Sequence, residues 1–309
     1  MKIKKIVTVT IGIPAFNEES NIGYLLSDLL KQHEKGFVIE KIIVSSDGSS
    51  DNTVKIVKGI KSKKISVINN RDRVGAAGRQ NQLCQVSSSD YLLLLNADTL
   101  ILDKNFVHKL VLQAKNNKAD LVSANLQELA PMSFFEKILA TSMRFKKTAF
   151  EAFNQGNNIY TCYGPARMFS KRLYKVVHFG ESYGEDAFSY LFCLRQNMVY
   201  RYAKNAFVFY KLPGTITDHK KQSYRFIESQ KRMMKLFGCR FACQEYYMPY
   251  LSVFFHLPNF FVRNPIYTTL YLSLFIYSCI GGIFRLMSRN VVQTWDVSAS
   301  TKQLRRGTI

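Results

Sequence analysis

The sequence predicts an α/β fold in which a central, mostly parallel sheet is flanked by helices. In the first hundred residues, short apolar or β-branched runs alternate with segments whose apolar residues repeat at helical spacing. The runs are continuously apolar, which is typical of parallel strands buried on both faces. Polar loops follow three of these runs and read NEES, DGSSDN and NAD. Ligands of open α/β sheets bind at such carboxyl ends of strands.

The N-terminal part divides into predicted strands and helices in alternating order. Residues 6–13 are rich in β-branched side chains and end at Pro14, and residues 18–32 then carry leucine and isoleucine at helical spacing. The other strands are predicted over residues 39–44, 65–68 and 91–95, and the other helices over residues 53–61 and 75–86. The basic, apolar start could pass for a signal peptide. However, it is rich in β-branched residues, contains a proline and has no small-residue cleavage site, so a strand is favoured.

Beyond about residue 105 the alternation weakens. Helical patterns cover residues 132–150 and 185–196, and a strand is predicted over residues 199–210. Residues 222–237 predict a basic amphipathic helix, with apolar side chains on one face and lysine and arginine elsewhere. Such a helix can lie on an anionic bilayer surface or pack on the domain as a solvated helix.

The C-terminal segment predicts hydrophobic helices. Residues 266–284 form a run of 19 positions without a charge, close to the ~20 that span a bilayer. Residues 246–262 are also uncharged but contain two prolines and a histidine. Basic residues follow the last run, so the C-terminus is expected to be cytoplasmic. This pattern fits three arrangements: a two-pass hairpin that turns near residues 263–265, a helix pair in the membrane interface, or a buried helical core.

Composition limits the classes of partner. Lysine and arginine outnumber aspartate and glutamate by 43 to 22, a formal net charge of +21. This charge favours nucleic acid, anionic lipid headgroups or phosphorylated small molecules. The six cysteines include no CxxC pair, so their spacing fits neither a zinc site nor a disulfide framework.

Three carboxylates stand where chemistry is expected. Asp47 follows a strand, so it can accept hydrogen bonds from a planar base or a ribose, or form an Asx-turn. Asp98 ends the most apolar strand, where a carboxylate is costly unless it is paired, caps a helix, or binds Mg²⁺ or Mn²⁺ shared with phosphates. Asp186 follows Glu185 at a predicted helix start, where it can cap the helix or act as a general base for a hydroxyl.

Four motifs together carry a resemblance to a known family. The stretches VTIGIPAFNEESNI, IIVSSDGSSDNT, RDRVGAAGRQN and YLLLLNADTLIL, in this order and at these spacings, resemble the nucleotide-sugar half of a family 2 glycosyltransferase with the GT-A fold. The stretches YGPARMFSKRLY and GEDAFSYLFCLRQ resemble the acceptor side of the family. The resemblance covers roughly residues 6–235 and implies a GT-A domain over residues 1–240, divided at residue 103 into nucleotide-sugar (1–103) and acceptor (104–240) halves. Residues 241–309 then form a membrane-associated segment with a basic tail.

The resemblance implies a nucleotide-diphosphate sugar donor (a UDP- or GDP-sugar), a divalent cation (Mg²⁺ or Mn²⁺) and, usually, inversion at the anomeric carbon. It implies that Asp186 is the catalytic base and that Asp98 is the metal ligand. The donor-side residues that it implies are Pro14, Phe16 and Glu18 bordering the nucleotide, Asp47 on the base, Arg79 near the phosphates or base, Asn96 and Asp98 in the paired-acid motif, and Gln222 and Arg225 in an element similar to QxxRW.

Three positions depart from the family's pattern. Asn96 replaces the first acid of the paired-acid motif, and Phe226 stands where QxxRW has tryptophan. The strand over residues 199–210 lacks the histidine that often completes the metal shell at its end. His219 lies nearby in the sequence, although a lone histidine is more often incidental. These departures concern metal coordination more than the fold.

The expected function is sugar transfer to a hydroxyl or phosphate acceptor, lipid-linked or a growing glycan. We expect a membrane-associated enzyme with its catalytic domain and C-terminus in the cytoplasm, in contact with anionic lipids and not with nucleic acid. A decayed GT-A-like protein that binds membrane or nucleic acid is the alternative that Asn96 favours. A nucleotidyltransferase should carry a basic, Gly-rich loop after the first strand, where this chain reads PAFNEES.

Overall fold

The computed structural model describes residues 6–180, 184–248, 258, 260–287 and 304. The chain divides into two compact units. The first contains the chain up to Gln127 together with Cys162–Tyr210, and the second contains Glu128–Thr161 and most of the chain after Tyr210. The predicted domain boundary near residue 240 concerns the extent of the catalytic domain and stays a prediction.

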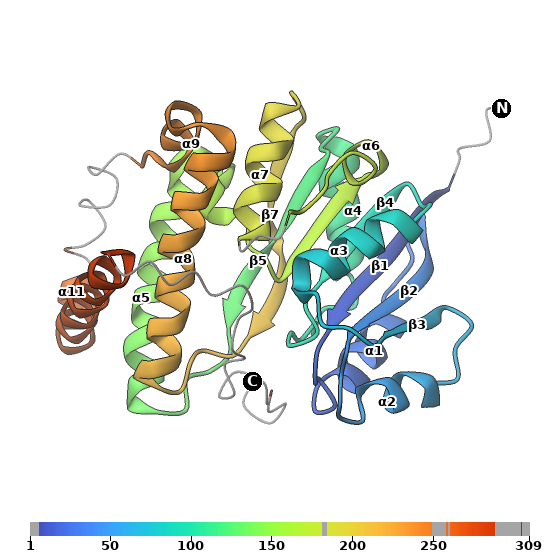
Figure 1. The fold of residues 1–309 in the computed structure, drawn as a ribbon, viewed down its shortest axis with the longest axis horizontal. Helices are drawn as coiled ribbons and strands as arrows, with labels where there is room; N and C mark the ends of the chain where they lie inside the picture. The colour runs from blue at the N-terminus through green and yellow to red at the C-terminus, as the bar shows by residue number, and fades with distance from the viewer. Residues whose placement is uncertain (1–5, 181–183, 249–257, 259, 288–303, 305–309) are drawn as a thin grey trace. The chain divides into compact units, whose positions relative to one another are not determined.

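A seven-stranded sheet forms the centre of the first unit (Figure 1). Its strand order is β3-β2-β1-β4-β6-β5-β7. The strands are β1 (Val7–Ala15), β2 (Phe37–Asp47), β3 (Ile65–Asn70), β4 (Tyr91–Leu95), β5 (Leu121–Glu128), β6 (Ala166–Ser170) and β7 (Tyr200–Tyr210). The pairs β1–β2, β2–β3 and β1–β4 are parallel, whereas β6 is antiparallel to both β4 and β5. The prediction of a mostly parallel α/β sheet is therefore confirmed for its first four strands.

Helices cover both faces of this sheet. They are α1 (Ile22–Leu30), α2 (Thr53–Gly59), α3 (Gly75–Val86), α4 (Phe106–Asn116), α6 (Lys171–Tyr174) and α7 (Glu185–Arg195). Alternate residues of β1, such as Val9 and Ile11, join one core with apolar residues of α1, α2 and α4. Gly12 faces the other side, where a Cβ would lie 3.0 Å from a methyl carbon of Leu83 on α3. The missing side chain lets α3 pack close to β1, and Figure 1 shows α3 crossing that strand.

The second unit is helical. Its elements are α5 (Phe134–Ala152), the 3₁₀ turns η1 (Phe153–Gly156) and η2 (Ile159–Thr161), α8 (Ile216–Phe237), α9 (Cys239–Tyr246) and α11 (Pro265–Met287). A capping box opens α5, because the Ser133 side chain accepts from the Glu136 N–H and the Glu136 carboxylate accepts from the Ser133 N–H. Aromatic contacts join α11 to α5, with the Phe134 and Tyr267 rings 5.6 Å apart between centroids.

The segments predicted to be hydrophobic helices are partly described. The run over residues 266–284 lies in α11, and most of the run over residues 246–262 lies outside the described residues. Within the described part of the chain, no helix combines the length and apolar character that a membrane crossing requires.

Candidate functional site

The candidate site lies at one edge of the sheet in the first unit. The parallel strands β1, β2 and β4 end there at Ala15, Asp47 and Leu95. Because β6 runs antiparallel to β4, with Leu95 opposite Ala166, the residues that precede β6 reach the same edge. The loops after the parallel strands and the loop before β6 therefore converge, as expected for ligand sites of open α/β sheets.

Hydrogen bonds join the loop after β1 to the loop after β2. The Asn17 N–H donates to Ser49 Oγ at 3.1 Å, and the Ser50 N–H donates to Asn17 Oδ1 at 2.9 Å. The Glu18 N–H donates to Thr53 Oγ1 at 2.7 Å. These bonds hold the segment of Pro14, Phe16 and Glu18 at the end of β1, with Glu18 buried and Pro14 and Phe16 half-buried.

Phe16 has a basic neighbour that the sequence analysis missed. The Arg73 guanidinium lies 4.1 Å from the centroid of the Phe16 ring, within the range of a cation–π interaction. Arg73 belongs to the motif RDRVGAAGRQN, which carries part of the family resemblance. Only the fold shows that Arg73, and not Arg71 or Arg79, is the arginine that lies over the Phe16 ring.

Asp47 organises the start of α3. Its carboxylate is 4% exposed and accepts hydrogen bonds from the Val74 N–H at 2.8 Å, the Gly75 N–H at 2.9 Å and Arg79 Nε at 2.7 Å. Arg79 also donates to the Asp72 carbonyl oxygen. The two residues predicted on the nucleotide's base and phosphates thus form a buried ion pair with each other. Their contacts with a nucleotide stay predictions.

Gly48 explains why the turn after Asp47 needs glycine. Its φ is +72°, and a Cβ built there would lie 2.9 Å from the Arg71 carbonyl oxygen. Any side chain would therefore meet both an unfavourable backbone conformation and a backbone clash.

The turn after β4 is anchored at both ends. The Asn96 N–H donates to the Pro165 carbonyl oxygen at 2.9 Å, and Leu100 pairs with Phe209 in an isolated antiparallel bridge. Ala97 between Asn96 and Asp98 is buried, whereas both neighbours are half-buried. Ala97 therefore packs in the core, whereas Asn96 and Asp98 remain partly accessible at the end of β4.

Asp186 reaches the same edge from α7. Its Oδ1 accepts from the Ala187 N–H at 2.8 Å, and its Oδ2 lies 3.6 Å from the position that a Cβ on Gly164 would occupy. Gly164 immediately precedes Pro165, whose carbonyl oxygen binds the Asn96 backbone. The loop before β6 therefore connects the carboxylate predicted as base to the turn that carries Asn96 and Asp98.

Arg167 holds the N-terminal turn of α7, and sequence reasoning missed it. This fully buried guanidinium donates from Nη1 to the Glu185 carbonyl oxygen at 2.6 Å and to Ser189 Oγ at 2.5 Å. Its Nη2 donates to Gln80 Oε1 on α3 at 3.1 Å. One arginine of β6 thus links α3 to the helix that carries Asp186.

Three cysteine thiols of the first unit are buried. Burial raises the pKa of the Cys84 thiol to about 12, against the lowering effects of Arg167 and Lys175. Burial also raises the pKa of Cys193 to about 12 and that of Cys162 further. Because the thiolate is the reactive form, burial makes these thiols poor nucleophiles.

The residues fit a cation that is shared with a ligand better than a closed metal cage. Within the described residues, no group of three or more histidine, cysteine, aspartate or glutamate side chains could hold an ion. Asp98 offers one carboxylate and Asn96 one amide oxygen at the end of β4. Mg²⁺ commonly binds through one or two carboxylates together with substrate phosphates, and this donor set suits such a site.

The remaining predicted residues lie in the second unit. Gln222 and Arg225 are half-buried on α8, about one turn apart, and their predicted position against a diphosphate stays a prediction. His219 packs edge-on against Phe135, with ring centroids 6.3 Å apart. Burial, helped by Lys146, lowers the pKa of His219 to about 4, so it is neutral at physiological pH.

Comparison with known sequences identifies a family and relatives of part of the chain. The family model described as Glycosyl transferase family 2 matches residues 10–177. A glucosyltransferase of Escherichia coli, UDP-Glc:alpha-D-GlcNAc-diphosphoundecaprenol beta-1,3-glucosyltransferase WfgD, is 28% identical over 35% of this chain and 42% of its own length. The poly-beta-1,6-N-acetyl-D-glucosamine synthase of Staphylococcus aureus is 30% identical over 33% of this chain and 24% of its own length. The match therefore spans less than half the length of these curated relatives.

Solved structures share the fold. The mannosyltransferase PcManGT of Pyrobaculum calidifontis, in complex with GDP-Man and Mn²⁺, has a TM-score of 0.57 at 12% identity and covers 92% of this chain and 76% of its own. S. aureus TarS 1-349 in complex with UDP has a TM-score of 0.53 at 16% identity and covers 72% of this chain and 65% of its own. These similarities confirm the GT-A fold.

Proposed function

The chain belongs to glycosyl transferase family 2, and from that membership we propose that it transfers a sugar from a nucleotide-diphosphate sugar to an acceptor hydroxyl or phosphate. The observation that carries the proposal is the meeting of Asn96, Asp98 and Asp186 at one edge of the sheet, linked through Gly164 and Pro165. A carboxylate suited to a cation and a second carboxylate suited to a base are what this reaction needs.

The donor is proposed to be a UDP- or GDP-sugar. Similar structures contain GDP-Man, UDP and UDP-GlcNAc, which supports both nucleotides. Asp47 uses three hydrogen bonds of the roughly four that a carboxylate accepts, so one N–H of a base can still bind it. Pro14, Phe16 and Glu18 would border the nucleotide, and Arg79, which is paired with Asp47, would lie near the phosphates or base.

Asp186 is proposed to act as the base in a single displacement. Its carboxylate takes the proton of the acceptor hydroxyl while that oxygen attacks the anomeric carbon. The bond from this carbon to the diphosphate oxygen breaks, and its electron pair leaves with the diphosphate, so configuration inverts. The hydrogen bond from the Ala187 N–H holds the Asp186 carboxylate at the N-terminus of α7 for this role. A divalent cation held by Asp98 would offset charge on the diphosphate.

The acceptor is proposed to be lipid-linked or a growing glycan at the cytoplasmic face of a membrane. The names of the two curated relatives describe a diphosphoundecaprenol-linked acceptor and a polysaccharide product, which supports this class. The net charge of +21 and the basic face of α8 support contact with anionic lipids. We further propose that the catalytic domain and the C-terminus are cytoplasmic.

The proposal is tested with purified protein in detergent and Mn²⁺ or Mg²⁺. Release of UDP, GDP or TDP is scored for each sugar nucleotide. Asp186→Asn keeps the size of the side chain but removes the base, so turnover should fall by about 10²-fold or more. Glu185→Gln removes a charge from the same helix turn and should keep most of the activity. Near-normal turnover by Asp186→Asn would contradict the base assignment.

A further inference from the structure

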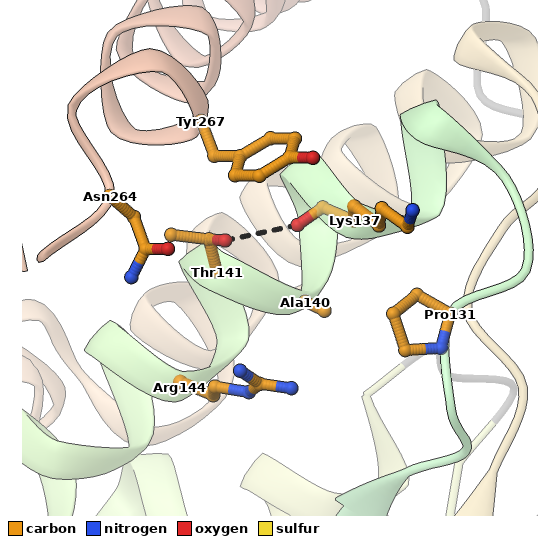
Figure 2. A pocket seen from close by; sticks show the side chains of 7 residues that line it. All are labelled: Pro131, Lys137, Ala140, Thr141, Arg144, Asn264 and Tyr267. Atoms are coloured by element: carbon orange, nitrogen blue, oxygen red, sulfur yellow. Dashed lines mark hydrogen bonds between the residues drawn. The ribbon is translucent and has the colours of Figure 1, made fainter.

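The second unit contains a cavity that the proposed chemistry does not use. It lies between α5 and the segment at the start of α11 and has a volume of about 150 Å³. Figure 2 shows the side chains that line it, among them Lys137, Thr141 and Arg144 from α5 and Asn264 and Tyr267 from the α11 segment. Because the three α5 residues are spaced three or four apart, they share one face of that helix.

The wall of the cavity is positively charged, and the nearby acids are buried and already bonded. Arg144 Nε lies 3.4 Å from Glu128 Oε1, and 62% of the Arg144 side chain is exposed. Glu136 is buried and accepts hydrogen bonds from the backbone N–H groups of Met132 and Ser133. Lys137 is exposed. The cavity therefore presents two cations to solvent while the carboxylates beside it face the protein.

This arrangement suits a phosphate group. An arginine fork and a lysine ammonium two helical turns apart can each bind a different phosphate oxygen. The Asn264 amide and the Tyr267 hydroxyl add neutral donors, and the Tyr267 ring is positioned by its contact with Phe134. The Thr141 hydroxyl donates to the Lys137 carbonyl oxygen at 3.0 Å, so it is already committed as a donor.

The segment that closes the cavity exposes an apolar face. Thr268 and Tyr271 of α11 are buried, whereas Val262 and Ile266 are 80% and 67% exposed. Leu270, one turn after Ile266 on α11, is also exposed. Large apolar side chains exposed along one segment favour an interaction site. A phosphate-sized basic cavity at the start of an apolar helix face matches a phosphate ester that carries hydrocarbon chains.

We propose that this cavity binds the phosphate of an anionic phospholipid in a bilayer, with the exposed face of α11 against the acyl chains. The inference rests on the proposed membrane attachment of the enzyme and identifies the residues that make the contact. A basic residue near an anionic membrane strengthens binding about fivefold, so Lys137 and Arg144 together contribute about 25-fold.

The test measures flotation of the full chain with vesicles of phosphatidylcholine alone or mixed with phosphatidylglycerol. Lys137→Gln combined with Arg144→Gln should weaken binding to the phosphatidylglycerol vesicles about 25-fold. The control combines Lys61→Gln with Lys63→Gln, which removes the same charge from an exposed loop of the first unit and should cost less than about twofold. Equal losses in the two double variants, or no loss in the first, overturn the proposal.

Two further measurements separate the possible ligands and the two proposals. Ile266→Ser should weaken binding to both kinds of vesicle. If vesicle binding by Ile266→Ser is unchanged and the wild type binds inorganic phosphate tightly, the cavity is a site for a soluble phosphate, and the lipid assignment is overturned. Donor turnover is measured on the same wild-type preparation. Turnover without vesicle binding overturns this inference alone, and vesicle binding without turnover overturns the proposed function alone.

Discussion

Asn96 stands where the paired-acid motif has its first acid, and its surroundings explain how the site tolerates an amide. Its backbone N–H is bonded to Pro165 and its carbonyl oxygen accepts from the Thr99 hydroxyl at 2.8 Å, so the turn is held without help from the side chain. An amide oxygen can still accept a ribose hydroxyl but brings no charge. Asp98 is therefore the residue that would supply negative charge to a cation bound at the end of β4.

Replacing Asp98 tests that assignment. In Asp98→Ala, donor turnover should fall by about 10²-fold or more and should no longer respond to added Mn²⁺, because the site loses its charged oxygen ligand. Turnover is measured against cation concentration, with and without excess chelator. Asp103→Ala is the matched control, since Asp103 lies five residues on and pairs with Lys109 at 2.7 Å on the surface. Retained turnover of Asp98→Ala in chelator would contradict the metal role.

At the scale of elements, β6 and α7 decide where the base stands. The Arg167 guanidinium is buried, and within the described residues its hydrogen bonds go to neutral oxygens of Glu185, Ser189 and Gln80. Burying a charge on neutral partners is costly, so an apolar residue of similar size can leave stability nearly unchanged. The arginine then serves chiefly to position α7.

Arg167→Met is expected to separate positioning from stability. The N-terminal turn of α7 loses two hydrogen bonds, so kcat should fall about 10-fold or more while the donor KM stays near normal. Thermal unfolding is measured beside the kinetics, and Ser189→Ala, which removes one of the two acceptors on α7, should show a smaller effect. A donor KM that rises as much as kcat falls would contradict a role restricted to Asp186.

The predicted elements were confirmed where local pattern is strong. The helix over residues 75–86 and the strand over residues 91–95 match α3 and β4, and residues 222–237 lie within α8. Among the elements that were absent from the prediction are α4, β5 and β6. The buried residues of α4 do have helical spacing, so that helix was predictable. The strands β5 and β6 mix polar with apolar residues, and β6 buries an arginine, so their strand character comes from neighbours in the sheet.

At the scale of the whole molecule, ligand binding should be visible as stability. A nucleotide that binds only the folded state stabilises it by about 2.7 kcal/mol at a hundred times its Kd. UDP or GDP with Mn²⁺ should therefore raise Tm by about 5–10 °C, and the larger shift identifies the nucleotide of the donor. The measurement is a thermal melt with each nucleotide, with and without chelator.

Variants show which residues carry this stabilisation. Asp186→Asn should keep the full shift, because the base contacts the acceptor, whereas Asp98→Ala should lose the part that depends on the cation. If neither nucleotide raises Tm in the presence of Mn²⁺, the proposed donor site is contradicted.

The sequence alone determined the order of the first strands and helices and the positions of the polar residues at strand ends. Both are local properties: a periodic apolar pattern commits a segment to a strand or helix, and parallel connection then puts the strand ends at one edge. Asp47 and Asp98 could be singled out on this basis, and Asp186 by its place at a predicted helix start and by the family resemblance.

Only the tertiary structure decided how those residues meet. The antiparallel insertion of β6 beside β4 brings Gly164, Pro165 and Asp186 to the turn after β4, and pairing of Asp47 with Arg79 buries both charges in one contact. These contacts join residues that lie far apart in the sequence. Strand order and side-chain partners are set by packing across the sheet, and no local pattern in the sequence records them.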